Sequence, residues 1–248
     1  MSETDPYAGL SAVLGAAGRL HVDPNRQTRK GVPEVVFAAG KTPQVTLTAV
    51  RELLERGPTG RVLVSRAPAE LAAYLQSSLE ADHVQVLATP GGGTLALIRD
   101  GADPPRETGG VVGLLTAGAS DAPVADEAAW VAEEMGCRIV RADDVGVAGL
   151  HRLEAPLRRL REDGCDVVIV VAGMDGALPS VVAGLVDVPV IGLPTSIGYG
   201  LGGGGVAALL SMLQTCAPCL VVVNIDNGVG AGATAALMAN RVAAARRS

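Results

Sequence analysis

The sequence predicts an α/β protein with two domains, of which the larger, C-terminal one is a doubly wound parallel sheet. Two observations carry this prediction. Five short runs of β-branched and aliphatic residues recur after residue 110, and stretches of helical length separate them. Hydrophobic residues make up 48% of the 248 residues but aromatic residues only 2%, which suits strands and helices packed closely through Val, Leu, Ile and Ala.

The aliphatic runs and helical stretches of the C-terminal half alternate regularly. Strands are expected at 111–116, 137–140, 166–171, 188–193 and 220–225. Helices are expected at 123–135, 148–161, 177–186, 206–215 and 231–246. Such alternation implies right-handed crossovers and a parallel sheet that helices cover on both faces.

The N-terminal half is less regular and predicts a smaller α/β domain. Thr42 before Pro43 is a favoured helix start, so a helix is expected over 42–56. Strands are expected at 61–65, 84–88 and 95–99.

The segment 100–110 is rich in proline and glycine, which is typical of a linker. We therefore expect an N-terminal domain over residues 1–108 and a C-terminal domain over residues 109–248.

Charge and the first residues limit the partners. A net charge of -6 without a long basic run argues against nucleic acid as a partner. The chain begins with acidic residues where a signal peptide is basic, and no apolar run reaches the ~18 residues of a membrane span. We expect a cytoplasmic protein without a membrane segment.

Cysteine and histidine usage predicts free thiols and no histidine-rich metal centre. The four cysteines are Cys137, Cys165, Cys216 and Cys219, and without a secretory signal they do not resemble a disulfide framework. The three histidines are scattered, with no Cys or carboxylate at ligand spacing.

Ligands of open parallel sheets bind at the carboxyl ends of strands, and two loops there carry polar groups among glycines. The first contains Gly118, Ser120 and Asp121, which can offer backbone N–H groups and a hydroxyl to phosphate, or simply cap a helix. The second contains Gly173 and Asp175. A carboxylate beyond a buried strand suits proton transfer, although a helix cap is the slightly favoured interpretation of Asp175 from the residues alone.

A third loop, 194–205, combines Thr195, Ser196, Tyr199 and Gly200 with a run of glycines. Glycines let the backbone approach a ligand closely, so we favour phosphate contact over a plain surface loop. The loop lacks the Gly-Lys-Ser/Thr of a Walker motif.

A fourth loop holds Asn224, Asp226 and Asn227 after the last expected strand. These polar groups could bind a ribose or a metal, and Asx turns would look similar.

Cys216 and Cys219 form a Cys-x-x-Cys motif that fits neither common use of that spacing. A zinc site needs four ligands, and no second pair stands at suitable spacing. A redox pair favours a first thiol at a helix N-terminus, whereas Cys216 follows the expected helix 206–215, whose dipole opposes ionisation. A thiolate at Cys216 would need support from a basic side chain or a cationic ligand.

Longer motifs connect the chain to known families. The C-terminal half resembles aminoimidazole ribonucleotide carboxylases in residues 118–121, 172–173, 178–179 and 189–192. The whole chain resembles the nickel-pincer cofactor biosynthesis protein B family, the pyridinium-3,5-biscarboxylic acid mononucleotide synthases, in residues 23–43, 194–200, 216–217 and 224–228.

The resemblance implies a flavodoxin-like three-layer C-terminal domain and a specific reaction. Nicotinic acid adenine dinucleotide would be carboxylated at ring C5 by CO2 or bicarbonate, and its phosphoanhydride hydrolysed to release AMP. The family's nucleophilic cysteine falls on Cys216, and its glutamate base falls on Asp175, whose side chain is shorter. Lys41, Arg66 and Glu34 are further candidates for contact with the dinucleotide, or are solvated or structural.

Anhydride hydrolysis also leads us to expect a divalent metal, Mg²⁺, whose ligands the sequence does not name.

The order of elements separates Cys216 from the other candidates. Cys216 precedes the fifth strand, whereas the polar loops follow their strands. We therefore expect a site shared between subunits of a homo-oligomer, an octamer by analogy with the carboxylase fold. A purine-pathway carboxylase and a non-catalytic nucleotide-binding module are the alternatives, and neither requires Cys216.

Overall fold

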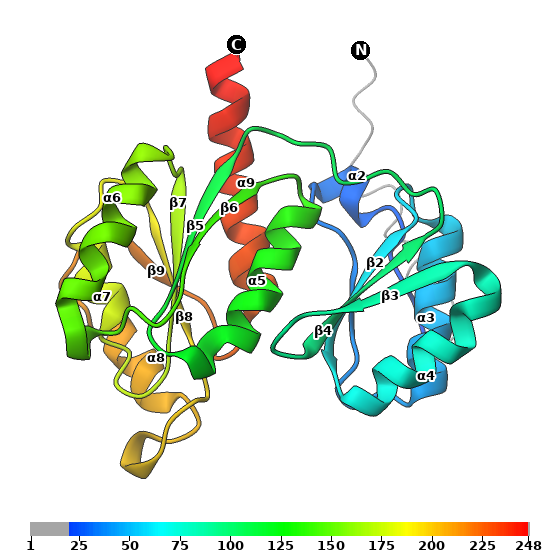
Figure 1. Ribbon diagram of the computed structural model, residues 1–248, viewed down its shortest axis with the longest axis horizontal. Coiled ribbons are helices and arrows are strands. Elements are labelled where there is room, and N and C mark those ends of the chain that lie inside the picture. Colours follow the sequence, from blue (N-terminus) through cyan, green and yellow to red (C-terminus); the bar gives the residue numbers. More distant parts are fainter. Residues whose placement is uncertain (1–19, 248) are drawn as a thin grey trace.

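The computed structural model describes residues 20–247 and contains two α/β units, each built around its own sheet (Figure 1). The segment 100–110 connects the last strand of the first sheet to the first strand of the second. The acidic first residues, 1–5, from which the absence of a signal peptide is expected, lie outside the described part of the chain.

The N-terminal unit is a four-stranded mixed sheet with helices on one face. Its strands are β1 (Val35–Phe37), β2 (Arg61–Ala67), β3 (Val84–Ala88) and β4 (Gly93–Arg99), in the order β1-β2-β4-β3. β1 is parallel to β2, and the other pairs are antiparallel. Helices α3 (Pro43–Arg56) and α4 (Ala69–Leu79) pack against the sheet around one apolar core, and α2 (Arg26–Lys30) precedes them.

The C-terminal unit is a five-stranded sheet in which every pair is parallel. Its strands are β5 (Val111–Thr116), β6 (Arg138–Ala142), β7 (Val167–Ala172), β8 (Val190–Pro194) and β9 (Leu220–Val222). Their order, β6-β5-β7-β8-β9, is the flavodoxin-like order, which confirms the predicted fold class.

Helices cover both faces of this sheet (Figure 1). α5 (Ala122–Glu134) and α9 (Gly228–Arg247) lie on the side of the N-terminal unit, and α6 (Glu154–Glu162), α7 (Leu178–Ala183) and α8 (Val206–Leu213) lie on the other. Every residue of β5, β7 and β8 is therefore buried, which explains why these strands are unbroken aliphatic runs.

Small residues let α5 and α9 approach each other closely. A Cβ atom at Gly232 would lie 2.3 Å from the carbonyl oxygen of Ala128. Buried alanines line both helices on either side of this contact: Ala125, Ala129, Ala132, Ala231, Ala235, Ala236 and Ala239. This packing needs no large side chains, consistent with the low aromatic content.

Local chemistry explains several boundaries. Thr42 caps α3 as predicted, with its hydroxyl accepting a hydrogen bond from the Val45 N–H at 3.3 Å. The helix expected over 148–161 is interrupted: a 3-10 segment, Val147–Leu153, precedes α6, and Gly149 inside that segment has non-helical dihedrals (φ −145°, ψ 71°) and kinks it. The strand expected over 220–225 ends at Val222, and the strand expected over 61–65 extends through a bulge.

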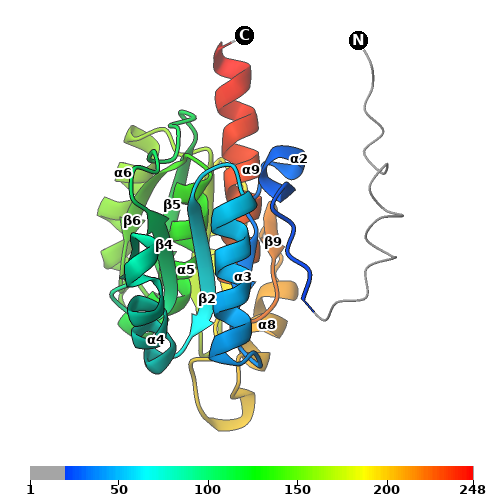
Figure 2. The ribbon, with the colours of Figure 1, turned by 90° about the vertical axis from the view of Figure 1, so that its right-hand side faces the viewer.

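The sequence missed α2, β1 and α4, which lack a clear local pattern. In the view from the N-terminal unit, α3 lies in front of its sheet and α9 rises beside α2 (Figure 2). A Cβ at Gly31, just after α2, would lie 3.7 Å from Leu237 of α9, so these helices touch across the two units. Within the described residues, no helix is long and apolar enough to cross a membrane.

Candidate functional site

Asp121 holds together the loop that follows β5. Its side chain is buried; Oδ2 accepts a hydrogen bond from the Gly118 N–H at 2.9 Å, and Oδ1 accepts one from the Thr195 hydroxyl at 2.7 Å. Burial raises the pKa of Asp121, opposed by hydrogen bonds from Thr195 and the backbone of Gly118 and Gly173. Asp121 is thus an internal brace that joins the loop to β8, while neighbouring Ser120 is exposed.

Gly173 brings the loop after β7 against the loop after β8. A Cβ at this position would lie 2.2 Å from the Ile197 carbonyl oxygen and 2.6 Å from the Thr195 hydroxyl. The Met174 N–H donates to the same Ile197 oxygen at 2.9 Å. The loop has no room for a side chain at residue 173.

Asp175 is exposed at the same edge of the sheet. Its Oδ1 accepts a long hydrogen bond, 3.4 Å, from the Ala177 N–H at the start of α7. The side chain is therefore accessible to a ligand. Its contact with Ala177 is a local turn bond across two residues rather than the predicted helix cap, because Ala177 itself stands at the N-cap position of α7 and no side chain caps that helix.

Asp226 joins the loops after β8 and β9. Its Oδ1 accepts a hydrogen bond from the Ser196 N–H at 2.7 Å, and its own N–H donates to the Pro194 carbonyl at 2.7 Å. These contacts hold Asp226 in a left-handed conformation, φ 54°. Beyond Ser196 the loop projects outward, with Tyr199 and Gly200 exposed.

The two asparagines of the last loop make local bonds. Asn227 Oδ1 accepts a hydrogen bond from the Gly230 N–H at 2.8 Å and caps α9, which explains why this helix begins earlier than predicted. Asn224 Oδ1 accepts one from the Ile225 N–H at 2.9 Å. Both residues line the cleft described below.

Arg66 reaches this edge from the N-terminal unit. It occupies the bulge near the end of β2 in a left-handed conformation, φ 58°. Its Nη2 donates to the Asp226 carbonyl oxygen, and its Nε lies 3.7 Å from Glu127 Oε2. A strained backbone therefore aims a cation across the boundary between the units.

Glu127 is a site residue that the sequence analysis missed. It lies on α5 with its side chain 6% exposed; Oε2 accepts a hydrogen bond from the Ser65 hydroxyl at 2.5 Å, and Oε1 accepts one from the Val229 N–H at 3.1 Å. The sequence offers one signal for Glu127: two adjacent acidic residues, Asp126 and Glu127, interrupt an otherwise alanine-rich helical stretch.

A cleft of about 490 Å³ lies between the units, at the place where Arg66 and Glu127 meet the last loop. It brings together four of the predicted residues, Arg66, Asn224, Asp226 and Asn227. The remaining lining residues are Arg26, Val35, Phe37, Ser65, Glu127, Ile225 and Val229.

Two further cations are close by: Arg26 lines the cleft, and Lys41 lies beside it. Arg26 Nε lies 2.7 Å from Glu34 Oε2, and burial raises the pKa of Glu34 against the lowering effect of Arg26. Lys41 donates to the Phe37 carbonyl at 2.6 Å, and its Nζ lies 5.8 Å from the centre of the Phe37 ring. Lys41 is thus beside the cleft without lining it.

Cys216 lies apart from these residues. It is exposed in the connection between α8 and β9, at the amino end of β9, whereas the polar loops follow the carboxyl ends of their strands. All four cysteines are free, as expected. Burial raises the pKa of Cys137 and of Cys165 to about 11, so these two thiols are suited to structural roles.

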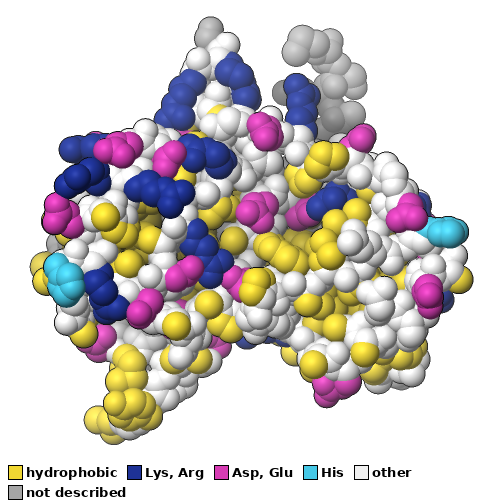
Figure 3. All heavy atoms as spheres, in the orientation of Figure 1, with side chains coloured by type: hydrophobic (Ala, Val, Ile, Leu, Met, Phe, Trp, Pro, Cys, Tyr) yellow, Lys and Arg dark blue, Asp and Glu magenta, His cyan; other side chains and the backbone are white. Residues whose placement is uncertain are grey.

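Two other surfaces lie outside this site. A second cavity, of about 650 Å³, is lined by Trp130, Arg61 and the linker, and by none of the predicted site residues. Figure 3 shows hydrophobic side chains exposed in the hollow between the two units. Exposed apolar side chains gather on the projecting loop, α8 and β9: Ile197, Tyr199, Leu201, Val206, Leu210, Leu213 and Val221.

Comparisons with known proteins match both units. The family model for AIR carboxylase matches residues 111–248, and that for a LarB/PurE-like N-terminal domain matches residues 15–89. An uncharacterized protein of Methanocaldococcus jannaschii is 42% identical over 89% of this chain and 84% of its own length. An N5-carboxyaminoimidazole ribonucleotide mutase of Pyrococcus horikoshii is 32% identical over 53% of this chain and 71% of its own length. A mutase of the same description from Methanocaldococcus jannaschii is also 32% identical, over 50% of this chain and 73% of its own length.

Proposed function

Because the chain belongs to the AIR carboxylase family and carries a LarB/PurE-like N-terminal domain, we propose that it is a pyridinium-3,5-biscarboxylic acid mononucleotide synthase. It would carboxylate C5 of the pyridinium ring of nicotinic acid adenine dinucleotide and hydrolyse the phosphoanhydride, releasing AMP. One observation carries the proposal: Arg66 of the N-terminal unit completes a cleft at the carboxyl edge of the carboxylase-like sheet. The mutases align with only about half of this chain, 53% and 50%.

The chemistry explains why a thiol is needed. A pyridinium ring is electron-poor and does not attack CO2. Addition of the Cys216 thiolate to C4 converts the ring into an enamine, whose C5 can form a bond to the carbon of CO2. Asp175 would then accept the C5 proton, and departure of the thiolate would restore the aromatic ring. The positive ring also supplies the cation that a thiolate after a helix C-terminus requires.

The cleft supplies groups that suit a dinucleotide. Arg66 in the cleft and Lys41 beside it are cations that could interact with phosphates, and Asn224 and Asp226 offer polar groups to a ribose. The loop from Gly118 supplies further backbone N–H groups at the same edge. Asp121 would act indirectly, by holding this loop.

A divalent ion fits this arrangement if substrate phosphates supply most of its ligands. Mg²⁺ is commonly held by one or two carboxylates together with phosphates. Residues 20–247 contain no cluster of three His, Cys, Asp or Glu suited to a metal. Asp226, which lines the cleft, is the carboxylate best placed to contribute. The ion would neutralise phosphate charge during anhydride hydrolysis.

The position of Cys216 supports a site shared between subunits. Cys216 stands between α8 and β9, next to the exposed apolar surface of those elements. Covering that surface with a second copy of the chain would bring the thiol of one subunit to the loops of another. We propose a homo-oligomer, an octamer by analogy with the carboxylase fold.

The reaction can be tested with the dinucleotide, bicarbonate and Mg²⁺. We expect release of AMP and a pyridine mononucleotide heavier by one CO2. Both products should be lost in Cys216→Ala and kept in the matched control Cys219→Ala. Unchanged turnover in Cys216→Ala would refute the covalent mechanism.

Sharing of the site has a separate test. Cys216→Ala and Asp175→Asn chains, each inactive alone, would be co-expressed with different tags and the mixed oligomers purified. Activity in the mixture requires Cys216 of one chain to act with Asp175 of another. Mixed oligomers without activity, from chains that assemble normally, would show that each site belongs to one chain.

The similarity to two named mutases favours one alternative, a carboxylase or mutase acting on an aminoimidazole ribonucleotide. That activity would not need Cys216. Conversion of the carboxyamino ribonucleotide by both wild type and Cys216→Ala, with no AMP from the dinucleotide, would favour it. Binding of nucleotide with no product from either substrate would instead indicate a binding module.

A further inference from the structure

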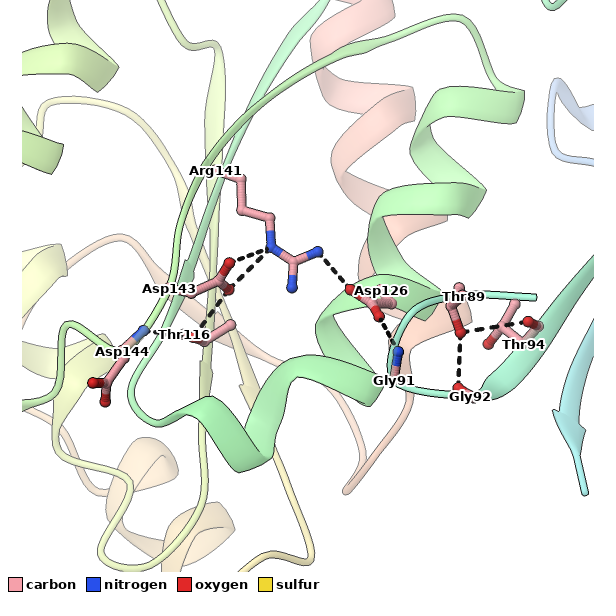
Figure 4. A network of polar contacts seen from close by, with 9 residues as sticks. All are labelled: Thr89, Gly91, Gly92, Thr94, Thr116, Asp126, Arg141, Asp143 and Asp144. Carbon is pink, nitrogen blue, oxygen red and sulfur yellow. Dashed lines mark hydrogen bonds and ion pairs between the residues drawn. The ribbon is translucent and has the colours of Figure 1, made fainter. Parts of the chain in front are cut away.

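Arg141 joins two parts of the molecule that are far apart in sequence, the β3–β4 turn and the loop after β5. We propose that Arg141 is a positioning residue, which holds the loop from Ala117 to Asp121 and couples it to the N-terminal unit. The inference rests on the proposed function in one respect, that this loop contacts the substrate. The coupling itself follows from contacts between described residues (Figure 4).

The guanidinium of Arg141 lies between two carboxylates. Its Nη1 donates to Asp126 Oδ1 at 2.5 Å, and its Nε lies 3.0 and 2.9 Å from the two oxygens of Asp143. The side chain of Asp126 is only 5% exposed, so removing Arg141 would leave a buried carboxylate without its ion-pair partner. The planar fork of arginine can serve both carboxylates at once, which a lysine cannot do in the same geometry.

Asp143 carries the connection to the loop after β5. The buried hydroxyl of Thr116 donates to Asp143 Oδ1 at 3.2 Å and accepts from the Asp144 N–H at 3.0 Å. Thr116 ends β5 and is followed directly by Ala117. A Cβ at Gly146 would lie 2.6 Å from the Ala117 carbonyl oxygen, so the segment 143–146 packs tightly on the start of the loop.

Asp126 carries the connection to the N-terminal unit. Its Oδ2 accepts a hydrogen bond from the Gly91 N–H, 3.2 Å away in the turn between β3 and β4. A Cβ at Gly91 would lie 2.9 Å from Pro123 Cγ, so the turn sits directly on the first residues of α5. The Thr89 hydroxyl donates to the Gly92 carbonyl at 2.8 Å and stabilises the turn.

Arg141 is therefore the side chain through which these two sets of contacts meet. Without Arg141, Asp126 keeps its hydrogen bond from Gly91 but loses its counter-charge. Asp143 keeps its hydrogen bond from Thr116 but loses its ion pair. We expect the turn at 89–93 and the loop at 116–121 to loosen together. A loosened loop would weaken substrate binding more than it would slow the chemical step, because Arg141 does not touch the reacting atoms.

Two variants and one control test this coupling. Arg141→Met removes both connections. Asp143→Asn acts at a partly exposed carboxylate and should loosen 116–121 while 89–93 stays protected. Arg138→Met is the matched control, since Arg138 is an exposed residue of the same strand that pairs with Asp163 at 3.0 Å.

Hydrogen exchange of peptides covering 89–93 and 116–121 is the first measurement, and steady-state kinetics with the dinucleotide is the second. For Arg141→Met we expect faster exchange in both segments and a rise in KM of about tenfold, equivalent to about 1.4 kcal/mol, with a smaller change in kcat. The control should match the wild type in both measurements.

The outcomes separate the coupling from the proposed function. Faster exchange at 89–93 with unchanged exchange at 116–121 in Arg141→Met would overturn the coupling. Coupled exchange with an unchanged KM, or a loss confined to kcat, would overturn the positioning role. A wild-type protein that releases no AMP from the dinucleotide would refute the proposed function, while the exchange data would still decide the coupling.

Discussion

Replacement of Glu127 tests whether a buried carboxylate joins the two units. In Glu127→Ala, the buried Ser65 hydroxyl and the Val229 N–H both lose their acceptor. Hydrogen bonds to a charged group contribute about 1.5–3 kcal/mol each, so the two together predict a loss of about 3–6 kcal/mol in the free energy of unfolding.

The ion pair with Arg66 adds little to this figure. The separation is 3.7 Å and the Arg66 side chain is 37% exposed, so solvent screening limits its contribution to under about 1 kcal/mol. Glu127→Gln keeps one oxygen for a donor, and we expect it to lose about 1–3 kcal/mol.

The assay is urea unfolding followed by fluorescence of the single tryptophan, Trp130, which lies on the same helix. The control is Glu162→Gln, an exposed residue at the end of α6. If the free energies of unfolding of both Glu127 variants lie within about 0.5 kcal/mol of the control, the buried carboxylate does not hold the two units together.

Three further predictions concern the loops and the exposed surface. Gly173→Ala should lower the free energy of unfolding in urea by about 1–3 kcal/mol and weaken ligand binding, because the new methyl group overlaps the neighbouring loop. An unchanged free energy of unfolding would contradict the described packing. The raised pKa of Asp121 means that the folded state binds its proton more tightly than the unfolded state does. Its stabilising contribution is present below the usual pKa of 3.8 and is lost as pH rises through the folded-state pKa. The difference in free energy of unfolding between wild type and Asp121→Asn should therefore change with pH in that window. A difference that does not depend on pH would show that the pKa of Asp121 is not raised. Leu213→Glu should give a folded protein that has no carboxylase activity and whose assembly has a lower molar mass by light scattering than that of the wild type. Leu185→Glu, on another exposed patch, should leave the assembly intact. Equal molar masses for the two variants would remove α8 from the proposed interface.

Much of the C-terminal fold was predictable because its signals are local. Strands such as β7 are buried on both faces and therefore appear as continuous aliphatic runs. Thr42 and Pro43 mark a helix start through bonds within one turn. The N-terminal sheet was harder to predict, since β1 is only three residues long and forms a strand through its pairing with β2.

The site was predictable in outline and not in its contacts. Loops after parallel strands share one edge whatever their sequence, so Gly118, Thr195 and Asp226 could be expected near one another. Glu127 and Arg141 were missed because a charged residue on a helix or strand is more often solvated than buried. Nothing local distinguishes a buried carboxylate that will meet Ser65, 62 residues away, from one that faces water.

The sequence by itself determined the order of strands and helices in the C-terminal unit, the polar loops at one edge of its sheet, and the position of Cys216 before β9 at the other. These follow from periodicity and chain direction, which no packing can change. Only the tertiary structure decided that Arg66 reaches Asp226, 160 residues away, and that Asp126 and Glu127 fasten the N-terminal unit to the carboxylase-like sheet. Such contacts depend on how the two sheets and their helices pack against each other, and that packing is determined by the fit of whole surfaces rather than by any local run of residues.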